Sequence, residues 1–163
     1  MLNLSQTIEI IKDVYNLSGN EIIVEREGVY FTASFVYSGH KISVEINKDR
    51  MYEYYLDISV RKNASCEPTA FWQLFAYHEN SPFNMCCDAD NLTFYLAHLK
   101  YYVDNDKIFY EVYDIPNRKR YFYLDGVKRE IDYIVDADFN TETTKLFGKN
   151  AARVINNRPV YVG

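Results

Sequence analysis

The chain has 163 residues, a formal net charge of −5 and a sequence pI of about 5.2. Hydrophobic residues make up 48% of the chain and charged residues 25%, and there are only 6 glycines and 4 prolines. This composition excludes a disordered or linker-rich chain. No segment approaches the roughly 18 consecutive apolar residues that span a bilayer, and the N-terminus lacks the basic and apolar regions of a signal peptide. We therefore expect a cytoplasmic protein that makes no membrane contact and folds as one domain over residues 1–163.

The charge is unevenly distributed along the chain. Residues 1–117 carry 9 Lys and Arg against 17 Asp and Glu, whereas residues 118–163 carry 9 against 6. This polarity favours electrostatic recognition of a partner over any particular chemistry. Residues with AT-rich codons are abundant, among them 16 tyrosines and 10 phenylalanines, which points to a low-GC bacterial genome or a phage.

The first predicted element is an amphipathic helix over residues 4–17. Asn3 or Ser5 caps its start, and Gly19 marks its stop. Its apolar positions fall at helical spacing: Leu4, Ile8, Ile11, Val14 and Tyr15. This pattern predicts a helix that lies on the face of a sheet.

Four strand-like runs follow, and they predict a four-stranded antiparallel meander between residues 21 and 61. Apolar and polar residues alternate along them, which is typical of strands with one buried and one solvated face. The connections are short, as in a meander. The runs cover residues 21–27, 28–37, 40–47 and 50–61, and their turn candidates lie around Gly28, Ser38–Gly39 and Lys48–Asp49.

The fourth run contains the stretch MYEYYLDISV, residues 51–60, in which three tyrosines occupy four positions. Alternation divides it into two faces. The apolar face is predicted to hold Tyr52, Tyr54, Leu56, Ile58 and Val60, and the solvated face Glu53, Tyr55, Asp57, Ser59 and Arg61. Two of the three tyrosines are thus explained by packing, because aromatic residues suit a half-buried pleated surface. Only Tyr55 is left on the solvated face.

Two helices are predicted after the sheet. The first covers residues 69–79 and holds the single tryptophan, Trp72. The second begins at a cap provided by Asp88 or Asp90. Its apolar stripe is Leu92, Tyr95, Leu96, Leu99, Tyr102 and Val103. Phe94 and Tyr101 lie off this stripe, so the helix is apolar on two sides and is either central in the fold or part of an interface.

The C-terminal region is less regular. Residues 107–135 fit either a hairpin across Asp125–Gly126 or a helix, and the Asp-Gly turn signal favours the hairpin. Residues 140–157 predict a final helix that Pro159 ends. Taken together, the fold class is α+β: an N-terminal helix packed on a four-stranded antiparallel meander, followed by a mainly helical C-terminal half with one hairpin.

One segment partly resembles a metal site. Asp136, Asp138 and Asn140 match the first, third and fifth positions of a calcium loop, but Thr141 occupies the glycine position and Phe147 the position of the bidentate glutamate. Acidic residues beside a helix start also act as caps. We therefore predict no metal and no other cofactor.

Catalytic signatures are absent from the sequence. The three histidines, His40, His78 and His98, have no partner at zinc-ligand spacing, and Cys86–Cys87 is not a CxxC pair. A histidine-cysteine site assembled in space leaves no local signature and stays open. No phosphate-binding glycine loop is present. The segment NRKRYFY, residues 117–123, mixes bases with aromatics, but a chain of net charge −5 does not favour nucleic acid.

Two functional hypotheses remain. The favoured one is a non-catalytic protein-binding module, a small acidic inhibitor or antagonist of the immunity, anti-defence or chaperone type with a bacterial or phage partner. Tyr55 is its anchor, and Glu53 and Asp57 are its charged flank for a partner with a basic surface. The alternative is a ligand-binding or enzymatic α+β domain. Its aromatic pocket is expected to contain Phe31, Tyr54 and Trp72, with a histidine or Cys86 as the polar group.

Overall fold

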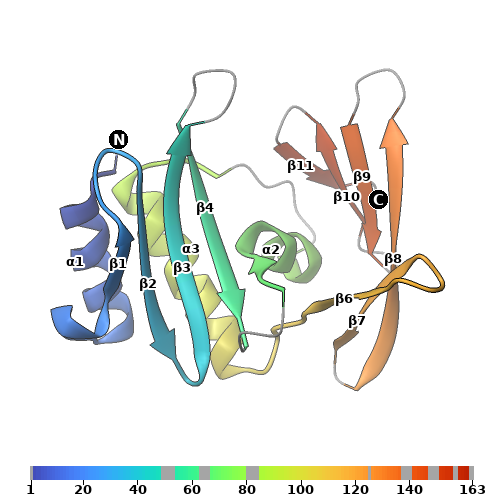
Figure 1. Ribbon diagram of the computed structural model, residues 1–163, viewed down its shortest axis with the longest axis horizontal. Coiled ribbons are helices and arrows are strands. Elements are labelled where there is room, and N and C mark those ends of the chain that lie inside the picture. The colour runs from blue at the N-terminus through green and yellow to red at the C-terminus, as the bar shows by residue number, and fades with distance from the viewer. Residues whose placement is uncertain are drawn as a thin grey trace.

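The computed structural model describes residues 2–48, 54–62, 67–79, 85–124, 126–136, 141–146, 151–155 and 158–161. Within these residues the chain forms two antiparallel sheets and three α-helices, which confirms the α+β class (Figure 1). The first sheet has the strand order β1-β2-β3-β4-β5, and the second has the order β11-β10-β9-β8-β7-β6. Neighbours in sequence are neighbours in space, so both sheets are meanders.

Helix α1 (Leu4–Tyr15) confirms the predicted N-terminal helix. The Asn3 side chain accepts a 2.8 Å hydrogen bond from the backbone N–H of Gln6, whose own side chain accepts one of 3.2 Å from the backbone of Asn3. This reciprocal capping box fixes the start of the helix. Asn16 has a left-handed backbone with φ 54°, so the helix stops there and not at Gly19.

The first sheet contains the predicted meander and one further strand. Its strands are β1 (Ile23–Arg26), β2 (Phe31–Tyr37), β3 (His40–Lys48), β4 (Tyr54–Arg61) and β5 (Thr69–Ala70). The predicted turn at Ser38–Gly39 is confirmed: both residues have positive φ, 49° and 77°, as the two central residues of a type I′ hairpin turn do. Strand β5 corrects the predicted helix over residues 69–79, because Thr69 and Ala70 pair with β4 and the helix begins at Phe71. Two residues carry no readable alternation.

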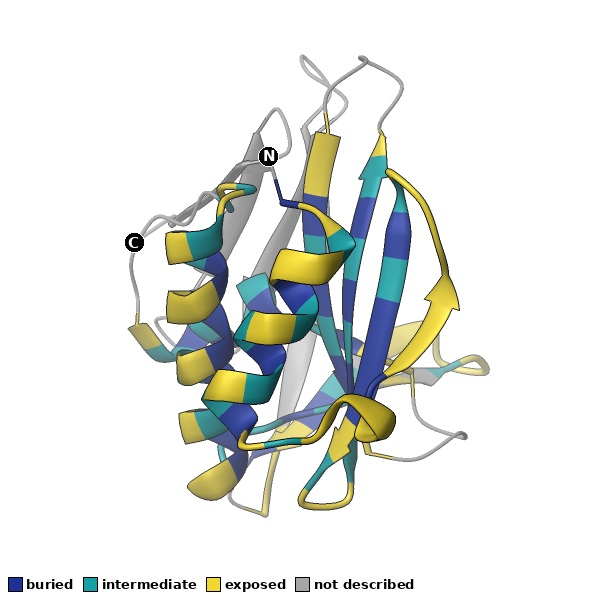
Figure 2. Cartoon of the chain, turned by 90° about the vertical axis from the view of Figure 1, so that its left-hand side faces the viewer, coloured by how far each residue is buried: buried dark blue, intermediate teal, exposed yellow. Residues whose placement is uncertain are grey.

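One face of this sheet is the centre of the hydrophobic core. Its buried residues are Phe31, Ala33, Phe35, Ile42, Val44, Ile46, Leu56, Ile58 and Val60. Helices α1 and α3 lie side by side over this face with their buried residues turned toward the strands (Figure 2). The predicted register of β4 is therefore confirmed from Leu56 to Val60. Tyr54, at the end of the strand, is 43% exposed and stacks on Tyr30, while Tyr52 lies outside the described residues.

Helices α2 (Phe71–Glu79) and α3 (Ala89–Asp104) also lie where the sequence predicts them. The Asp88 side chain caps α3 by accepting a 2.9 Å hydrogen bond from the backbone N–H of Asn91. All six residues of the predicted stripe are buried. Phe94 and Tyr101, on the other side, are 47% and 53% exposed, so α3 is not enclosed on both sides by the described residues.

The C-terminal half differs from the prediction, because its described residues form a second sheet. The strands are β6 (Glu111–Asp114), β7 (Lys119–Leu124), β8 (Val127–Asp136), β9 (Thr141–Leu146), β10 (Ala151–Ile155) and β11 (Arg158–Tyr161). The hairpin is confirmed, since Leu124 pairs with Val127 across Asp125–Gly126. The final helix over residues 140–157, and with it the mainly helical C-terminal half, is wrong.

The physical reason is that a weak helical pattern competed with a strong local preference for strands. Three of the first four residues of β9 are threonines, whose β-branched side chains favour extended backbone. The long strand β8 offers β9 a pairing partner over its whole length, from Asp136↔Thr141 to Ile131↔Leu146. Strand pairing of this kind depends on tertiary context, so it cannot be predicted from the helical spacing of apolar residues in the sequence.

The two sheets share buried residues. Phe109 stacks on Phe122 of β7 with ring centroids 4.2 Å apart, and both contact Tyr77 of α2. Thr69 donates a buried 2.8 Å hydrogen bond to the carbonyl of Phe109. The core of the first sheet therefore continues to β7. A single domain over residues 1–163 stays a prediction.

Candidate protein-binding face

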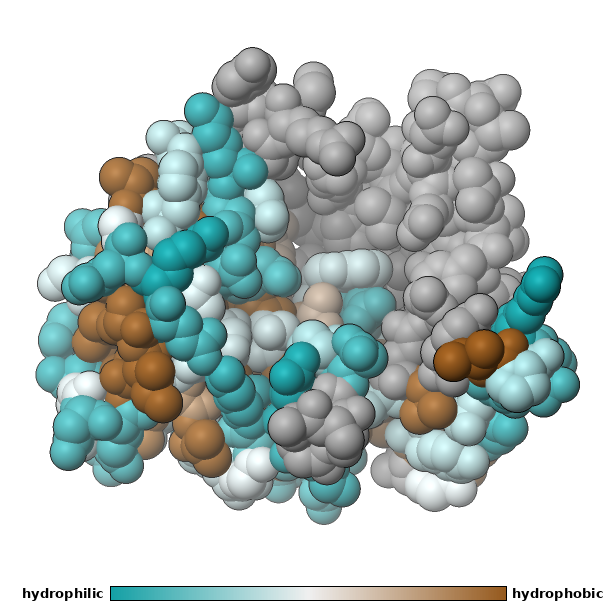
Figure 3. Space-filling model, viewed as in Figure 1, coloured by the Kyte–Doolittle hydropathy of each residue, from teal (hydrophilic) through white to brown (hydrophobic). Residues whose placement is uncertain are grey.

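The side of the first sheet that α1 and α3 leave uncovered is named the outer face. It carries the predicted partner-binding residues. The side chains on it come from four strands: Glu25, Arg26, Thr32, Ser34, Val36, Lys41, Ser43, Glu45, Asn47, Tyr55, Asp57, Ser59 and Arg61. Figure 3 views this side, which is largely hydrophilic over β3 and β4 and apolar toward β1 and β2. Ile23, opposite Ser34, and Val36, opposite Lys41, are the exposed apolar residues that the register places on this face.

A β-bulge in β1 brings two consecutive charged residues to the outer face. Val24 pairs with Ala33 and Arg26 with Thr32, so the register shifts by one residue at Glu25. A bulge of this kind re-aims side chains that strict alternation would send to opposite faces. Glu25 and Arg26 therefore both reach across the same side of the sheet.

Both side chains extend over β2 to β3, which is possible because β2 presents small residues there. Glu25 accepts a 2.6 Å hydrogen bond from Lys41 and a 3.1 Å bond from the hydroxyl of Ser34, which is only 1% exposed. The Lys41 ammonium holds the pKa of Glu25 below its usual range. Arg26 reaches over the neighbouring Thr32 in the same way.

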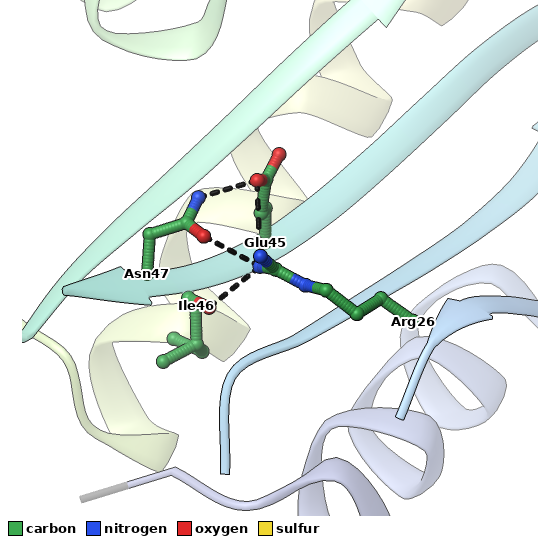
Figure 4. Close-up of polar contacts among 4 residues, drawn as sticks. All are labelled: Arg26, Glu45, Ile46 and Asn47. Atoms are coloured by element: carbon green, nitrogen blue, oxygen red, sulfur yellow. Dashed lines mark hydrogen bonds and ion pairs between the residues drawn. The ribbon is translucent and has the colours of Figure 1, made fainter. Parts of the chain in front are cut away.

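Arg26 is the centre of a polar cluster on β3 (Figure 4). Its guanidinium donates a 3.1 Å hydrogen bond to the carbonyl of Ile46 and lies 3.5 Å from the carboxylate of Glu45. It also donates to the side-chain oxygen of Asn47, whose amide group donates to Glu45. These contacts orient the Glu45 carboxylate on the outer face.

Asp57 lies directly opposite Glu45 in the register of β3 and β4. It is half-buried, and this burial raises the pKa of its carboxyl group above the usual value. The facing Glu45 carboxylate raises the pKa further, while a backbone hydrogen bond from Ile58 lowers it. Like charges at directly opposed positions destabilise a sheet, so this pair lowers the stability of the free protein.

Tyr55 lies one pair further along the same face, opposite Asn47, and is 43% exposed. The structure therefore brings two of the three predicted residues, Tyr55 and Asp57, to one side of one strand. Glu53 falls outside the described residues. Sequence reasoning missed Arg26, Glu45 and Asn47, since only the bulge and the register of β3 against β4 bring them beside Asp57.

The histidines make structural contacts in the described structure. His78 forms a 2.7 Å hydrogen bond with the carbonyl of Lys107 and packs against Tyr102. His98 bonds to the carbonyl of Phe94 and His40 to that of Ser38. Cys87 is half-buried, and burial raises the pKa of its thiol, which disfavours a reactive thiolate.

The three aromatic residues of the alternative pocket lie in different environments. Phe31 is fully buried in the core, Tyr54 is at the exposed end of β4, and Trp72 is half-buried on α2. Where the structure describes side chains, no ring contact joins any two of them. The packing thus gives this pocket no support.

Other features add no second site. The described residues contain no group of three or more His, Cys, Asp or Glu side chains placed to hold a metal ion. Asp136 ends β8, whereas Asp138 and Asn140 lie outside the described part of the chain. Among the described helices, none has the length and hydropathy to cross a membrane.

Comparison with protein-family models, curated proteins and solved structures finds no match for the chain.

Proposed function

We propose that the chain is a non-catalytic protein-binding module, an acidic inhibitor or antagonist of the immunity, anti-defence or chaperone type. Its partner is a cytoplasmic protein of a bacterium or phage, and a basic surface of that partner docks on the outer face. One observation carries this proposal. Tyr55 is half-exposed on β4, on the same face as Asp57, which lies opposite Glu45 across the sheet.

The chemistry of this arrangement suits a basic partner. A tyrosine provides a large contact area and loses little conformational freedom on binding, so it is a favoured anchor residue at interfaces. The Glu45–Asp57 pair costs folding stability in the free protein because two carboxylates lie opposite each other. A Lys or Arg side chain placed between them relieves that repulsion, and the relief contributes to binding.

The first step of the test identifies a partner by affinity capture from a low-GC bacterial lysate, followed by mass spectrometry. Binding kinetics of variants then test the face. Tyr55→Ala should mainly speed dissociation, whereas Glu53→Lys and Asp57→Lys should slow association and weaken its salt dependence.

Matched controls come from the helical side of the protein. Tyr101→Ala removes another half-exposed tyrosine, on α3, and Asp13→Lys reverses the charge of an exposed acid on α1. Both should bind as the unmodified protein does. Unchanged kinetics for Tyr55→Ala and Asp57→Lys would rule out the outer face as the docking surface.

A further inference from the structure

Strands β3 and β4 carry two like-charge pairs of opposite sign on the outer face. Glu45 faces Asp57, and two pairs further along Lys41 faces Arg61. The pair between them is Ser43 opposite Ser59. Each charged pair opposes folding, since like charges directly across an antiparallel ladder repel. Exchanging the residues at 57 and 61 would turn both repulsions into attractions.

The two charged residues of β3 have counter-ions on β1. Lys41 is paired with Glu25 at 2.6 Å, and Glu45 with Arg26 at 3.5 Å. Within the described ranges, no ion pair involves Asp57 or Arg61 of β4. On β3 and β4 the face therefore carries an acidic row and a basic row, separated by short serine side chains, and β1 contributes one counter-ion to each row. Four residues along a strand put the two rows about 13 Å apart.

We propose that the outer face binds a second copy of this chain, related by a two-fold axis along the serine row. The rotation reverses the strand direction, so the acidic row of each copy meets the basic row of the other. Asp57 of each copy then faces Arg61 of its partner, and Glu45 faces Lys41. The short serines let the two sheets approach at the centre.

Self-complementarity is what selects a second copy as the occupant. A two-fold interface requires that one patch fit its own rotated image, and two rows of opposite sign on either side of a neutral row meet this requirement. Another protein could match both rows at once only if it carried acidic and basic residues at the same spacing. The inference does not rest on the proposed function, although both use this face and therefore compete for it.

The size of the face indicates a weak dimer. Four strands at about 4.8 Å spacing and about seven residues of about 3.4 Å give roughly 450 Å² per copy. This is smaller than the roughly 800 Å² per partner of a standard stable interface. The association should therefore depend on protein concentration and weaken in high salt, because its main attractions are between charges near the surface.

Sedimentation velocity across a concentration series, at low and high salt, tests the proposal. The unmodified protein should form a dimer at low salt and dissociate at high salt. Asp57→Arg and Arg61→Asp should each weaken self-association at least tenfold, because each places like charges across the interface. An equal mixture of the two variants should dimerise again, since the arginine introduced in one variant then meets the aspartate introduced in the other.

Three further measurements keep the result interpretable. Each single variant should melt at or above the temperature of the unmodified protein, because each removes one like-charge pair within the sheet. If either fails to fold, Asp57→Asn and Arg61→Gln replace them and should weaken association less. Glu9→Lys with Lys12→Glu on α1 preserves net charge and should leave association unchanged. A monomer at every concentration in low salt, or variants that self-associate normally, would overturn the proposal.

Discussion

Tyr37, at the end of β2, donates a 2.6 Å hydrogen bond from its hydroxyl to the carboxylate of Asp104, the last residue of α3. The second carboxylate oxygen of Asp104 lies 3.4 Å from Lys100, whose ammonium is 5.5 Å from the centre of the Tyr37 ring. The hydrogen bond from Tyr37, followed by that from Lys100, lowers the pKa of Asp104. This contact fastens the C-terminal end of α3 to the sheet.

Tyr37→Phe should lower the free energy of unfolding by no more than about 1 kcal/mol at neutral pH, because it removes one solvent-exposed hydrogen bond and keeps the ring. A carboxyl group whose pKa is lower in the folded than in the unfolded protein stabilises the fold at pH values above its ordinary pKa. This stabilisation is lost as the pH falls through the pKa of the folded protein. The two proteins should therefore converge in acid. Urea denaturation over a pH series measures this, and a constant difference down to the lowest pH would contradict it.

Asp57→Asn should have the opposite pH dependence. A carboxyl group whose pKa is higher in the folded than in the unfolded protein destabilises the fold when it is ionised. This destabilisation disappears as the pH falls through the pKa of the folded protein. The variant should therefore be more stable than the unmodified protein at neutral pH and lose this advantage in acid. Thermal melts at several pH values test the sign. Glu9→Gln, on α1, should show no such gain.

Leu56 and Asp57 are neighbours with opposite surroundings and provide a test of register. Leu56 is 5% exposed on the core face, so Leu56→Asp should abolish soluble folding, because it buries a charge. Asp57→Leu, on the outer face, should be tolerated and fold as stably as the unmodified protein or more so. Expression and thermal melts compare the pair, and equal behaviour would show that the register is wrong.

Tyr15 joins α1 to α3 from within the core. It is 4% exposed, and its hydroxyl donates a 2.9 Å hydrogen bond to the carbonyl of Leu96. Tyr15→Phe should cost about 1 kcal/mol, and Tyr15→Ala about 3–5 kcal/mol through the cavity it leaves. Tyr101→Phe, at a half-exposed position, should change stability by less than about 0.5 kcal/mol. Chemical denaturation of the three variants gives the ranking.

Dialysis against a chelator should leave the melting temperature unchanged, since no credible ligand set is present in the sequence. The measurement covers the whole chain, including Asp136, Asp138 and Asn140. A rise of several degrees on adding calcium would contradict the prediction. Asp138→Asn would then show whether the calcium-like segment is responsible.

The elements that the sequence predicts correctly are those with long local periodicity. The six-residue stripe from Leu92 to Val103 repeats over three helical turns, and the alternation from Leu56 to Val60 continues in the neighbouring strand. The strands from Thr141 onward were missed because pairing with the neighbouring strand, and not local periodicity, decides their structure.

Most of the outer face is set by relationships that a one-dimensional pattern does not contain. Tyr55 and Asp57 are predictable because alternation alone places them. That Glu45 opposes Asp57 depends on how many residues connect β3 and β4. That Arg26 reaches Glu45 depends on a one-residue bulge in a different strand.

The bulge at Glu25 also limits how copies of the chain can add to one another. Strand β1 is an edge strand of the first sheet in the described structure, and its exposed Ile23 and Val24 would suit the edge-to-edge strand addition that leads to fibres (Figure 2). The shifted ladder leaves an incoming strand only a short regular stretch to pair with, and charged residues follow at once. The bulge therefore hinders the addition of further strands to β1. Association through the outer face closes after two copies, so the fold favours a finite assembly over an open-ended one.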